Sequence, residues 1–587
     1  MRILAPYVNG VCYISTVAVI SFLPMLMPFC CGAKEYQIYF AAFMVLCSIL
    51  LLYVVNRNAN KKLHVSEQLF RIVITDLFFA IYLAAGLLNM AFTAKSSPEP
   101  LWFCKWGTVI VAYLSGRVVL NKNRNLLYLF ISISGAIQSF IAILQYTGVL
   151  GISLNGYFPH SGSFQTPGAL GVFVSFAIIC NIYLLYYSVK AKRAYTMLML
   201  AGSLIISVAG LIVSDSRTAI IALMASSLLY LWRRTKNVKA GFRYLFYFIT
   251  TLSLLGATLV IYGKRPNSVG TRMLLWKVSL TMNKENPVIG NGVSSFSRDY
   301  MPCQEIYFRL HPSSEYAILS NNHYQSYNAF LQIYVEQGLL GIMVTVTLLT
   351  LVLIKSRKDA PPIYLLVCWF TASSFLYISD IPVFMILMAV FMGITESKDT
   401  VQFSTEFKLQ HARRMVVAST LLVGLLAGCI VFGITYRGRY NYALKNIDNS
   451  VQNSLYDKNI FFALLSAKSV FRSQGIDIED KIAIMEMRMK RFSTSEMLID
   501  LGDLYTLAGR FDKAEECYLR AFYMVPCRII PLYKLFILYD SGGNESMARD
   551  TAMKIVAVNT SVVNSLTIKI KSMAAKYLLP DKERSVN

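Results

Sequence analysis

Apolar runs separated by short polar loops fill residues 1–436. Each run has about 20 residues, enough for an α-helix to cross a hydrocarbon core roughly 30 Å thick. About thirteen runs predict membrane-spanning helices, at residues 9–30, 36–55, 69–92, 102–119, 125–147, 167–189, 195–213, 217–232, 244–262, 326–354, 361–377, 380–395 and 415–436. The pattern therefore predicts an all-α chain. A polytopic transmembrane bundle at 1–436, with a large outer loop at 263–325, precedes a soluble helical-repeat domain at 437–587.

The composition agrees with a membrane protein. Of the 587 residues 56% are hydrophobic and only 15% are charged, whereas a soluble protein carries roughly a quarter charged residues. The net charge of +24 could suggest a nucleic-acid partner. Much of the excess, however, lies in short loops between apolar runs, where basic residues set the orientation in the bilayer. We therefore expect no nucleic-acid partner.

Basic residues recur in every second short loop. These loops are residues 57–62, 122–124, 190–193, 233–243, 355–358 and 408–414. The intervening loops 148–166 and 378–380 contain neither Lys nor Arg. Because cytoplasmic loops carry the excess of basic residues, this alternation predicts a cytoplasmic N-terminus. Thirteen crossings then place the loop 263–325 and the C-terminal domain on the outer, non-cytoplasmic side of the membrane.

Several cations are predicted on the outer face, where the orientation rule does not call for them. They are Arg217, Lys264, Arg265, Arg272 and Lys277. A guanidinium binds phosphate oxygens through two parallel hydrogen bonds, so this set indicates a phosphate-bearing substrate. The nearby His323 could act as a base that activates an acceptor hydroxyl.

A polar stripe enters the apolar run at 326–354. Tyr324, Asn328, Gln332 and Glu336 are four residues apart, which predicts one polar face at the start of a helix. Polar side chains are costly inside a bilayer, so the stripe indicates a functional site.

Further motifs resemble the superfamily of O-antigen ligases and O-antigen polymerases, which includes bacterial protein O-oligosaccharyltransferases. The resemblance extends over about residues 120–395. The matching elements are Gln145 to Gly148, Gly162 to Pro167, Ser216-Arg217, Gly270, Arg272, Trp276, Pro287, Gly290, Gly292, and Tyr327-Asn328 nine residues before Gly338 to Gly341. The family has His at the position of Tyr327. Either His323, four residues earlier, or Tyr327 itself could take the role of that histidine.

The resemblance implies transfer of a glycan from undecaprenyl diphosphate to an acceptor hydroxyl at the periplasmic face, without cofactor or metal. The acceptor would be a glycan, a lipid or a protein. The predicted catalytic residues are His323, Arg272 and Arg217. The predicted substrate-binding residues are Arg265, Lys277, Trp276, Gly290, Gly292, Tyr327, Asn328, Gln332 and Glu336.

The C-terminal domain shows the spacing of a tetratricopeptide repeat. The relevant positions are Leu498, Leu501, Gly502, Tyr505, Ala514, Tyr518, Ala521 and Pro526. In such a repeat, small and aromatic residues of a helix pair interlock. The domain could bind a protein partner or the acceptor, or could pack on its own chain. Cys517 and Cys527 could pair in an oxidising compartment, but two free thiols are favoured.

Three other functions fit part of the sequence. A repeat-unit polymerase would share the same motifs. A polysaccharide transporter would place charged residues within its spans, for which Asp76 is the main candidate. A non-enzymatic scaffold that displays the repeats would leave the outer arginines and the polar stripe unexplained.

Overall fold

The computed structural model describes residues 5–23, 42–50, 53, 74–92, 100–120, 124–150, 158, 160–234, 266–355, 361–395, 470–472, 476–490 and 492–579. Every regular element in these ranges is helical, which confirms the all-α class. The predicted spans at 244–262 and 415–436 lie outside the described residues, as do Lys264 and Arg265.

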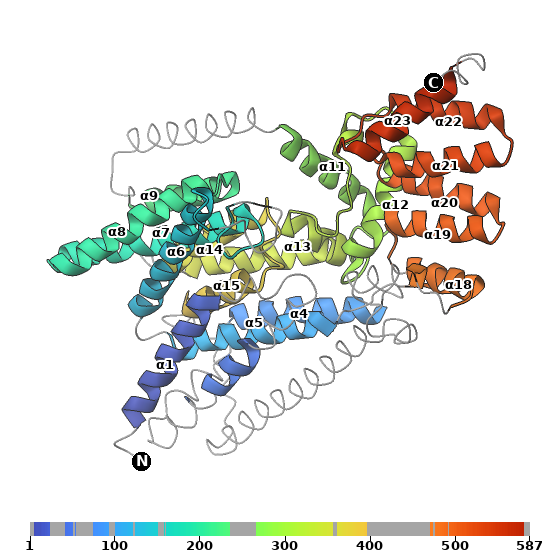
Figure 1. The fold of residues 1–587 in the computed structure, drawn as a ribbon. Helices are drawn as coiled ribbons and strands as arrows, with labels where there is room; N and C mark the ends of the chain where they lie inside the picture. The colour runs from blue at the N-terminus through green and yellow to red at the C-terminus, as the bar shows by residue number, and fades with distance from the viewer. Residues whose placement is uncertain are drawn as a thin grey trace, which may run out of the picture.

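Ten long helices and the helical residues 42–50 form an apolar bundle within the described ranges (Figure 1). The ten long helices are α1 (Ala5–Phe22), α4 (Ile74–Phe92), α5 (Pro100–Val118), α6 (Arg124–Tyr146), α7 (Pro167–Lys190), α8 (Ala194–Val213), α9 (Arg217–Arg234), α13 (Ala329–Lys355), α14 (Pro361–Ser373) and α15 (Pro382–Thr395). By length and composition, α6, α7, α8 and residues 329–354 of α13 could cross a membrane. Thirteen crossings remain a prediction.

Small residues allow the bundle helices to approach closely. A Cβ atom added at Gly116 of α5 would lie 2.5 Å from the carbonyl oxygen of Val390 in α15. One added at Gly393 of α15 would lie 2.1 Å from the carbonyl oxygen of Tyr113 in α5. Such contacts are typical of helix pairs in membranes, where close van der Waals packing replaces the hydrophobic effect.

Asp76, the residue that could have marked a transport pathway, is paired within the bundle. Its carboxylate accepts hydrogen bonds from the Tyr113 hydroxyl at 2.5 Å and from Arg117 Nη1 at 2.8 Å. Both partners lie on α5, so these contacts hold α4 against α5. This pairing gives Asp76 a structural role in the contact between the two helices.

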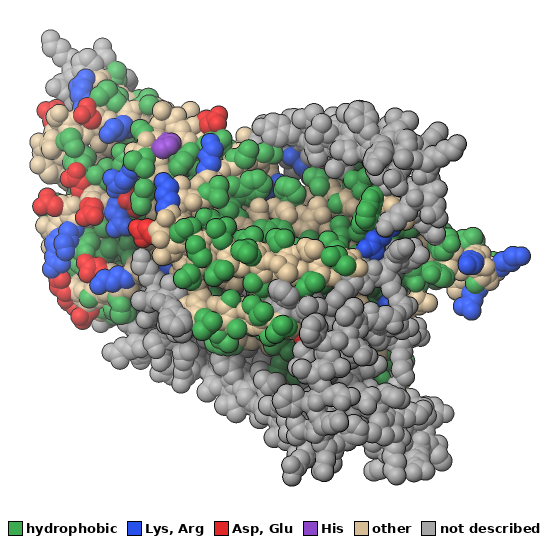
Figure 2. Space-filling model, turned by 180° about the vertical axis from the view of Figure 1, so that it is seen from behind, with side chains coloured by type: hydrophobic (Ala, Val, Ile, Leu, Met, Phe, Trp, Pro, Cys, Tyr) green, Lys and Arg blue, Asp and Glu red, His purple; other side chains and the backbone are tan. Residues whose placement is uncertain are grey.

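A second group of helices gathers at one end of the molecule (Figure 1). The loop between the apolar runs contributes α11 (Pro266–Met282), α12 (Ser295–Leu310) and the short 3₁₀ helix η4 (Glu315–Leu319). The C-terminal part contributes α18 (Ile478–Met489), α19 (Ser495–Leu507), α20 (Phe511–Met524), α21 (Ile529–Ser541), α22 (Glu545–Ala557) and α23 (Ser565–Leu578). Figure 2 shows charged side chains at this end and mostly hydrophobic side chains over the middle of the same face.

One hydrophobic core joins the loop helices to the C-terminal helices. Leu274 of α11 and Phe296 and Phe308 of α12 belong to the same buried cluster as Leu498 of α19 and Tyr518 of α20. Burial of this much apolar surface is the main stabilising contribution to such an interface. The loop and the C-terminal helices therefore lie on the same side of any membrane that the bundle crosses.

Successive C-terminal helices pack against one another. Gly502 of α19 packs on the ring of Tyr518, which a Cβ atom would approach to 2.6 Å. Ala514 and Ala521 of α20 are fully buried. The assignment to the tetratricopeptide repeat type stays a prediction. Cys517 is a buried free thiol, and so is Cys527.

Candidate functional site

The glycine-rich loop before α12 crosses α13 where that helix is broken. Gly338 has φ 65° and ψ −160°, a conformation open to glycine alone. The backbone N–H groups of Leu339 and Leu340 donate to the carbonyls of Pro287 at 3.0 Å and Val288 at 3.2 Å. The break leaves these N–H groups of α13 without partners in the helix, and the loop carbonyls accept their hydrogen bonds.

The close approach of this loop to α13 explains why glycines occupy two of its positions. Gly290 and Gly292 both have positive φ, and the Gly292 N–H donates to the Glu336 carbonyl at 3.1 Å. A Cβ atom at Gly290 would lie 2.6 Å from the backbone nitrogen of Gln337. The sequence predicted substrate contacts for Gly290 and Gly292. In the structure their backbones contact α13.

Asparagine side chains complete the crossing. Asn89 of α4 donates to the Ile289 carbonyl at 2.9 Å, and Asn291 donates to the Met282 carbonyl at 2.8 Å. Asn283 donates to the carbonyl of Tyr334 in α13. The sequence analysis missed Asn89. A lone polar residue near the end of an apolar run is the only local signal for it.

Arg217 is positioned by two of the motifs noted in the sequence. The Gln145 amide exchanges two hydrogen bonds with the backbone of Gly162, at 2.9 and 3.1 Å, and so closes the turn before α7. The Ser216 hydroxyl donates to the Gly168 carbonyl at 3.4 Å and accepts from the Ala219 N–H at 3.3 Å. Ser216 thereby caps α9, whose first residue is Arg217.

Arg217 and Arg272, here called the arginine pair, come together from α9 and α11. Burial lowers the pKa of the Arg272 guanidinium, Tyr327 raises it, and the like charge of Arg217 lowers it. Among the residues that the structure describes, neither arginine forms an ion pair with a carboxylate. Two partly buried guanidiniums without a carboxylate have the charge and the hydrogen-bond donors that an anion-binding site requires.

Tyr327 lies beside the arginine pair. It has φ 53°, in the left-handed region that a bulky residue rarely adopts. Burial raises the pKa of its hydroxyl, and the Arg272 charge lowers it in part. Its ring packs edge-on against Tyr377 in the loop between α14 and α15, with centroids 5.2 Å apart. Backbone strain of this kind is concentrated at functional sites.

His323 is next to Tyr327, although not through a shared helix. The polar stripe predicted a helix from about Tyr324, but α13 begins at Ala329 because Asn328 caps it. The Asn328 side-chain oxygen accepts from the N–H groups of Phe330 at 3.0 Å and Leu331 at 3.2 Å. The rings of His323 and Tyr327 still meet edge-on, with centroids 6.3 Å apart.

The His323 imidazole is neutral at physiological pH. Burial lowers its pKa to about 4. Its Nε2 atom is buried and has no hydrogen-bond partner among the described residues. Its ring also packs edge-on against Tyr300, at 6.0 Å between centroids. A neutral imidazole with a free ring nitrogen has the chemistry of a general base.

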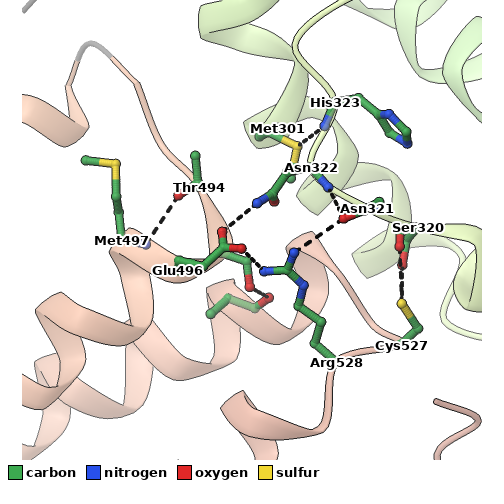
Figure 3. A network of polar contacts seen from close by, with 12 residues as sticks. Met301, Ser320, Asn321, Asn322, His323, Thr494, Glu496, Met497, Cys527 and Arg528 are labelled. Atoms are coloured by element: carbon green, nitrogen blue, oxygen red, sulfur yellow. Dashed lines mark hydrogen bonds and ion pairs between the residues drawn. The ribbon is translucent and has the colours of Figure 1, made fainter. Parts of the chain in front are cut away.

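The segment that carries His323 is held by the C-terminal helices (Figure 3). Glu496, at the start of α19, accepts hydrogen bonds from Asn322 and from Arg528. Arg528 also donates to Asn321 at 3.3 Å. The Cys527 thiol donates to the Ser320 carbonyl at 3.1 Å. The C-terminal domain therefore determines the path of the chain just before His323.

This contact predicts a pH dependence. Burial raises the pKa of the Glu496 carboxyl, but Arg528 and Asn322 lower it by more, so it lies below the usual 4.5. A depressed pKa stabilises the fold above the unfolded value and loses this effect as pH falls through the folded value. Since the pair is partly exposed, we expect Glu496→Gln to lower the melting temperature by roughly 1–3 °C at pH 7.

The measurement is thermal unfolding of the purified protein from neutral pH down to about pH 3.5. The difference between the wild type and Glu496→Gln should shrink as the pH falls below 4.5. Glu479→Gln is the matched control, because Glu479 pairs with Arg510 on an exposed surface. An equal and pH-independent effect of both substitutions would contradict the prediction.

The remaining predicted residues divide between two places. Trp276 lies one helical turn after Arg272 and packs on Phe375, with centroids 6.4 Å apart. The Lys277 ammonium lies 4.5 Å from the ring centroid of Tyr316 in η4. Gln332 donates to Glu336 at 3.3 Å, and both line a cavity of the bundle.

Comparison with known proteins supports the resemblance over part of the chain. No curated protein and no solved structure matches the sequence. A family model described as O-Antigen ligase matches residues 202–346. This range contains the arginine pair, His323 and Tyr327. It also contains Gly290, Gly292 and Gly338, where the glycine-rich loop crosses α13. The chain is thus a membrane protein with a segment similar to the O-Antigen ligase family, which supports membrane glycan transfer of the ligase or polymerase type.

Proposed function

We propose that the protein transfers a glycan from undecaprenyl diphosphate to an acceptor hydroxyl at the periplasmic face of the bacterial inner membrane. The observation that carries this proposal is the arginine pair, which lies beside Tyr327 and has no carboxylate partner in the described part of the chain. A buried like-charge pair is unfavourable by itself, and a diphosphate would neutralise it.

In this mechanism, the acceptor oxygen attacks the anomeric carbon of the donor sugar. A new carbon–oxygen bond forms, and the bond from that carbon to the diphosphate oxygen breaks. Undecaprenyl diphosphate leaves with an additional negative charge, which Arg217 and Arg272 stabilise. The proton of the acceptor hydroxyl passes to a base of the protein.

We assign the role of the base to His323 and a hydrogen-bonding role to Tyr327. His323 is neutral and its Nε2 atom can accept a proton. Tyr327 keeps its proton at neutral pH, because its pKa is raised, and its position beside Arg272 suits donation to the departing phosphate. The two residues thus share the task that the family gives to one histidine.

Substitution of the two residues separates these roles. We expect His323→Gln to lower the transfer rate 10²- to 10⁴-fold, the range for loss of a general base. Tyr327→Phe should lower it only about tenfold, the effect of one hydrogen bond. Wild-type activity should stay constant at neutral pH and fall as pH approaches 4, where His323 becomes protonated. A larger effect of Tyr327→Phe than of His323→Gln would reverse the assignment.

The common core of α12 and the C-terminal helices supports the proposed topology. It requires an even number of crossings between the loop 263–325 and the C-terminal domain. The sequence predicts four in that interval, and thirteen in all would put both regions in the periplasm. The transmembrane domain would then be residues 1–436 and the periplasmic domain residues 437–587. Contact of the latter with the His323 segment favours a role in presenting the acceptor.

The direct test is a reconstituted reaction. Purified protein in lipid vesicles should convert an undecaprenyl-diphosphate-linked glycan to free undecaprenyl diphosphate only when an acceptor is added. Deletion of the gene followed by analysis of lipopolysaccharide, glycoprotein and polymer length identifies that acceptor. Shortened polymers with intact attachment would identify a polymerase instead. Reporter fusions that place Arg272 in the cytoplasm would refute the proposal.

A further inference from the structure

A cavity of about 140 Å³ lies between α4, α5, α13, α14 and α15, separate from the arginine pair. Its lining includes the aromatic side chains of Tyr82, Trp102, Trp106 and Trp369. The rings of Tyr82 and Trp106 have centroids 5.1 Å apart, and those of Trp102 and Trp106 are 6.1 Å apart. The rings of Tyr82, Trp102 and Trp106 therefore form a continuous aromatic wall.

Polar groups face the same cavity. Lys105 and Asp380 form an ion pair at 3.0 Å, and Gln332 donates to Glu336 at 3.3 Å. These groups come from α5, from α13 and from the loop between α14 and α15. The sequence analysis assigned Gln332 and Glu336 to substrate binding, but it did not identify Lys105 or Asp380.

Three buried polar atoms at the cavity have no hydrogen-bond partner among the described residues. They are Asp380 Oδ2, Gln337 Oε1 and Trp369 Nε1. The side chains of Gln337 and Trp369 are only 6% and 5% exposed. A buried polar atom without a partner costs about 1–3 kcal/mol, and three around one cavity indicate a ligand that supplies both donors and acceptors.

The charges of the lining restrict the ligand. The Lys105 ammonium is already paired with Asp380, and the described lining includes no other Lys or Arg, so it has no free positive charge for a phosphate. It therefore disfavours a diphosphate, in contrast to the arginine pair. A polyprenyl tail would leave the three polar atoms without partners. A neutral sugar fits both features, because its C–H face packs on aromatic rings and its hydroxyls bond to carboxylates and amides.

The loop between α14 and α15 connects the cavity with the surroundings of the arginine pair. Tyr377 of this loop packs on Tyr327, and Asp380 three residues later lines the cavity. One short loop thus joins the cavity wall to the residue beside the arginine pair. The volume is below the roughly 300–1,000 Å³ of pockets for drug-sized ligands, which suits a single ring.

The geometry points to a saccharide subsite that binds one neutral sugar ring of the donor glycan between the aromatic wall and Glu336, Gln337 and Asp380. This inference rests on the proposed function, since it takes the sugar to belong to the lipid-linked donor. It adds a determinant of sugar specificity within the bundle.

Tryptophan fluorescence tests the subsite without measuring transfer, because three of the five tryptophans of the chain line the cavity. The full-length protein in nanodiscs is titrated with glycan released by mild acid from the polyprenyl-linked pool of the native cells. We expect a saturable change in emission. Glu336→Gln and Gln337→Met should each weaken binding at least tenfold. Glu285→Gln, at an exposed position of the outer loop, should leave it unchanged.

The outcomes separate this inference from the proposed function. Arg272→Ala should retain glycan binding while it loses transfer. Retention of transfer by Arg272→Ala, with binding abolished in Gln337→Met, would refute the diphosphate site and support the subsite. A change in emission with undecaprenyl phosphate but not with the released glycan would identify a lipid-tail pocket and overturn the subsite. The subsite would also be overturned if the glycan caused no change in emission. The same holds if Glu336→Gln and Gln337→Met fold and bind the glycan as tightly as the wild type.

Discussion

Arg272→Ala is expected to lower glycan transfer 10²- to 10³-fold while leaving the protein folded in the membrane. Loss of one charged donor to a developing anion typically raises the barrier by about 2.7–4 kcal/mol. The remaining Arg217 cannot neutralise both phosphates. Arg272→Lys should recover part of the activity, because it restores the charge but not the two parallel hydrogen bonds. The measurement is undecaprenyl diphosphate released per mole of reconstituted protein.

Lys284→Ala provides the matched control for this prediction. Lys284 is an exposed cation of the same loop, between α11 and Gly290. Its loss changes the local charge as Arg272→Ala does, but it should alter the rate less than twofold, since exposed charges are screened. Full activity of both Arg272→Ala and Arg217→Ala would eliminate the diphosphate-binding role of the arginine pair.

Gly338→Ala is expected to destabilise the fold strongly. The new Cβ atom would lie 2.2 Å from the Val288 carbonyl oxygen. The φ of 65° adds strain of about 1–3 kcal/mol for a residue other than glycine. Displacement of the loop would also break the hydrogen bonds from Leu339 and Leu340, at about 1 kcal/mol each. The expected total is several kcal/mol.

Thermal unfolding in detergent, together with the amount of monodisperse protein, measures this effect. Gly202→Ala in α8 is the control, because a Cβ atom there meets nothing within 4 Å. Alanine is favoured over glycine within a helix by up to about 1 kcal/mol, so the control should be neutral or stabilising. Gly290→Ala tests the opposite side of the crossing and should behave like Gly338→Ala. Unchanged stability of both would mean that the crossing does not support the fold.

Several helices were predicted from the sequence almost to the residue. The predicted spans 125–147, 167–189 and 195–213 correspond to α6, α7 and α8. Their signals are local, since each combines an apolar run with a boundary that its own residues define. In α7, Pro167 occupies the first turn and the Thr166 side chain caps it.

The candidate site was predicted only in part. The outer cations indicated an anion, and the structure brings Arg217 and Arg272 together without a carboxylate among the described residues. The role of the loop glycines was not predicted, because the clash that excludes a side chain at Gly290 comes from Gln337, far along the chain. The helical part of the polar stripe is also shorter than predicted, since Asn328 caps the N-terminus of α13 and Tyr324 lies before the helix.

The all-α class, the apolar bundle and the unusual cations beside it were predictable from the amino-acid sequence, because hydrophobicity and charge are properties of each residue and its near neighbours. The pairing of distant residues became known from the fold: Lys105 with Asp380, Glu496 with the segment before His323, and the loop helices with the C-terminal core. Such choices depend on which surfaces meet when distant segments pack together. Many side chains could satisfy the same charge or volume, and the fold selects among them.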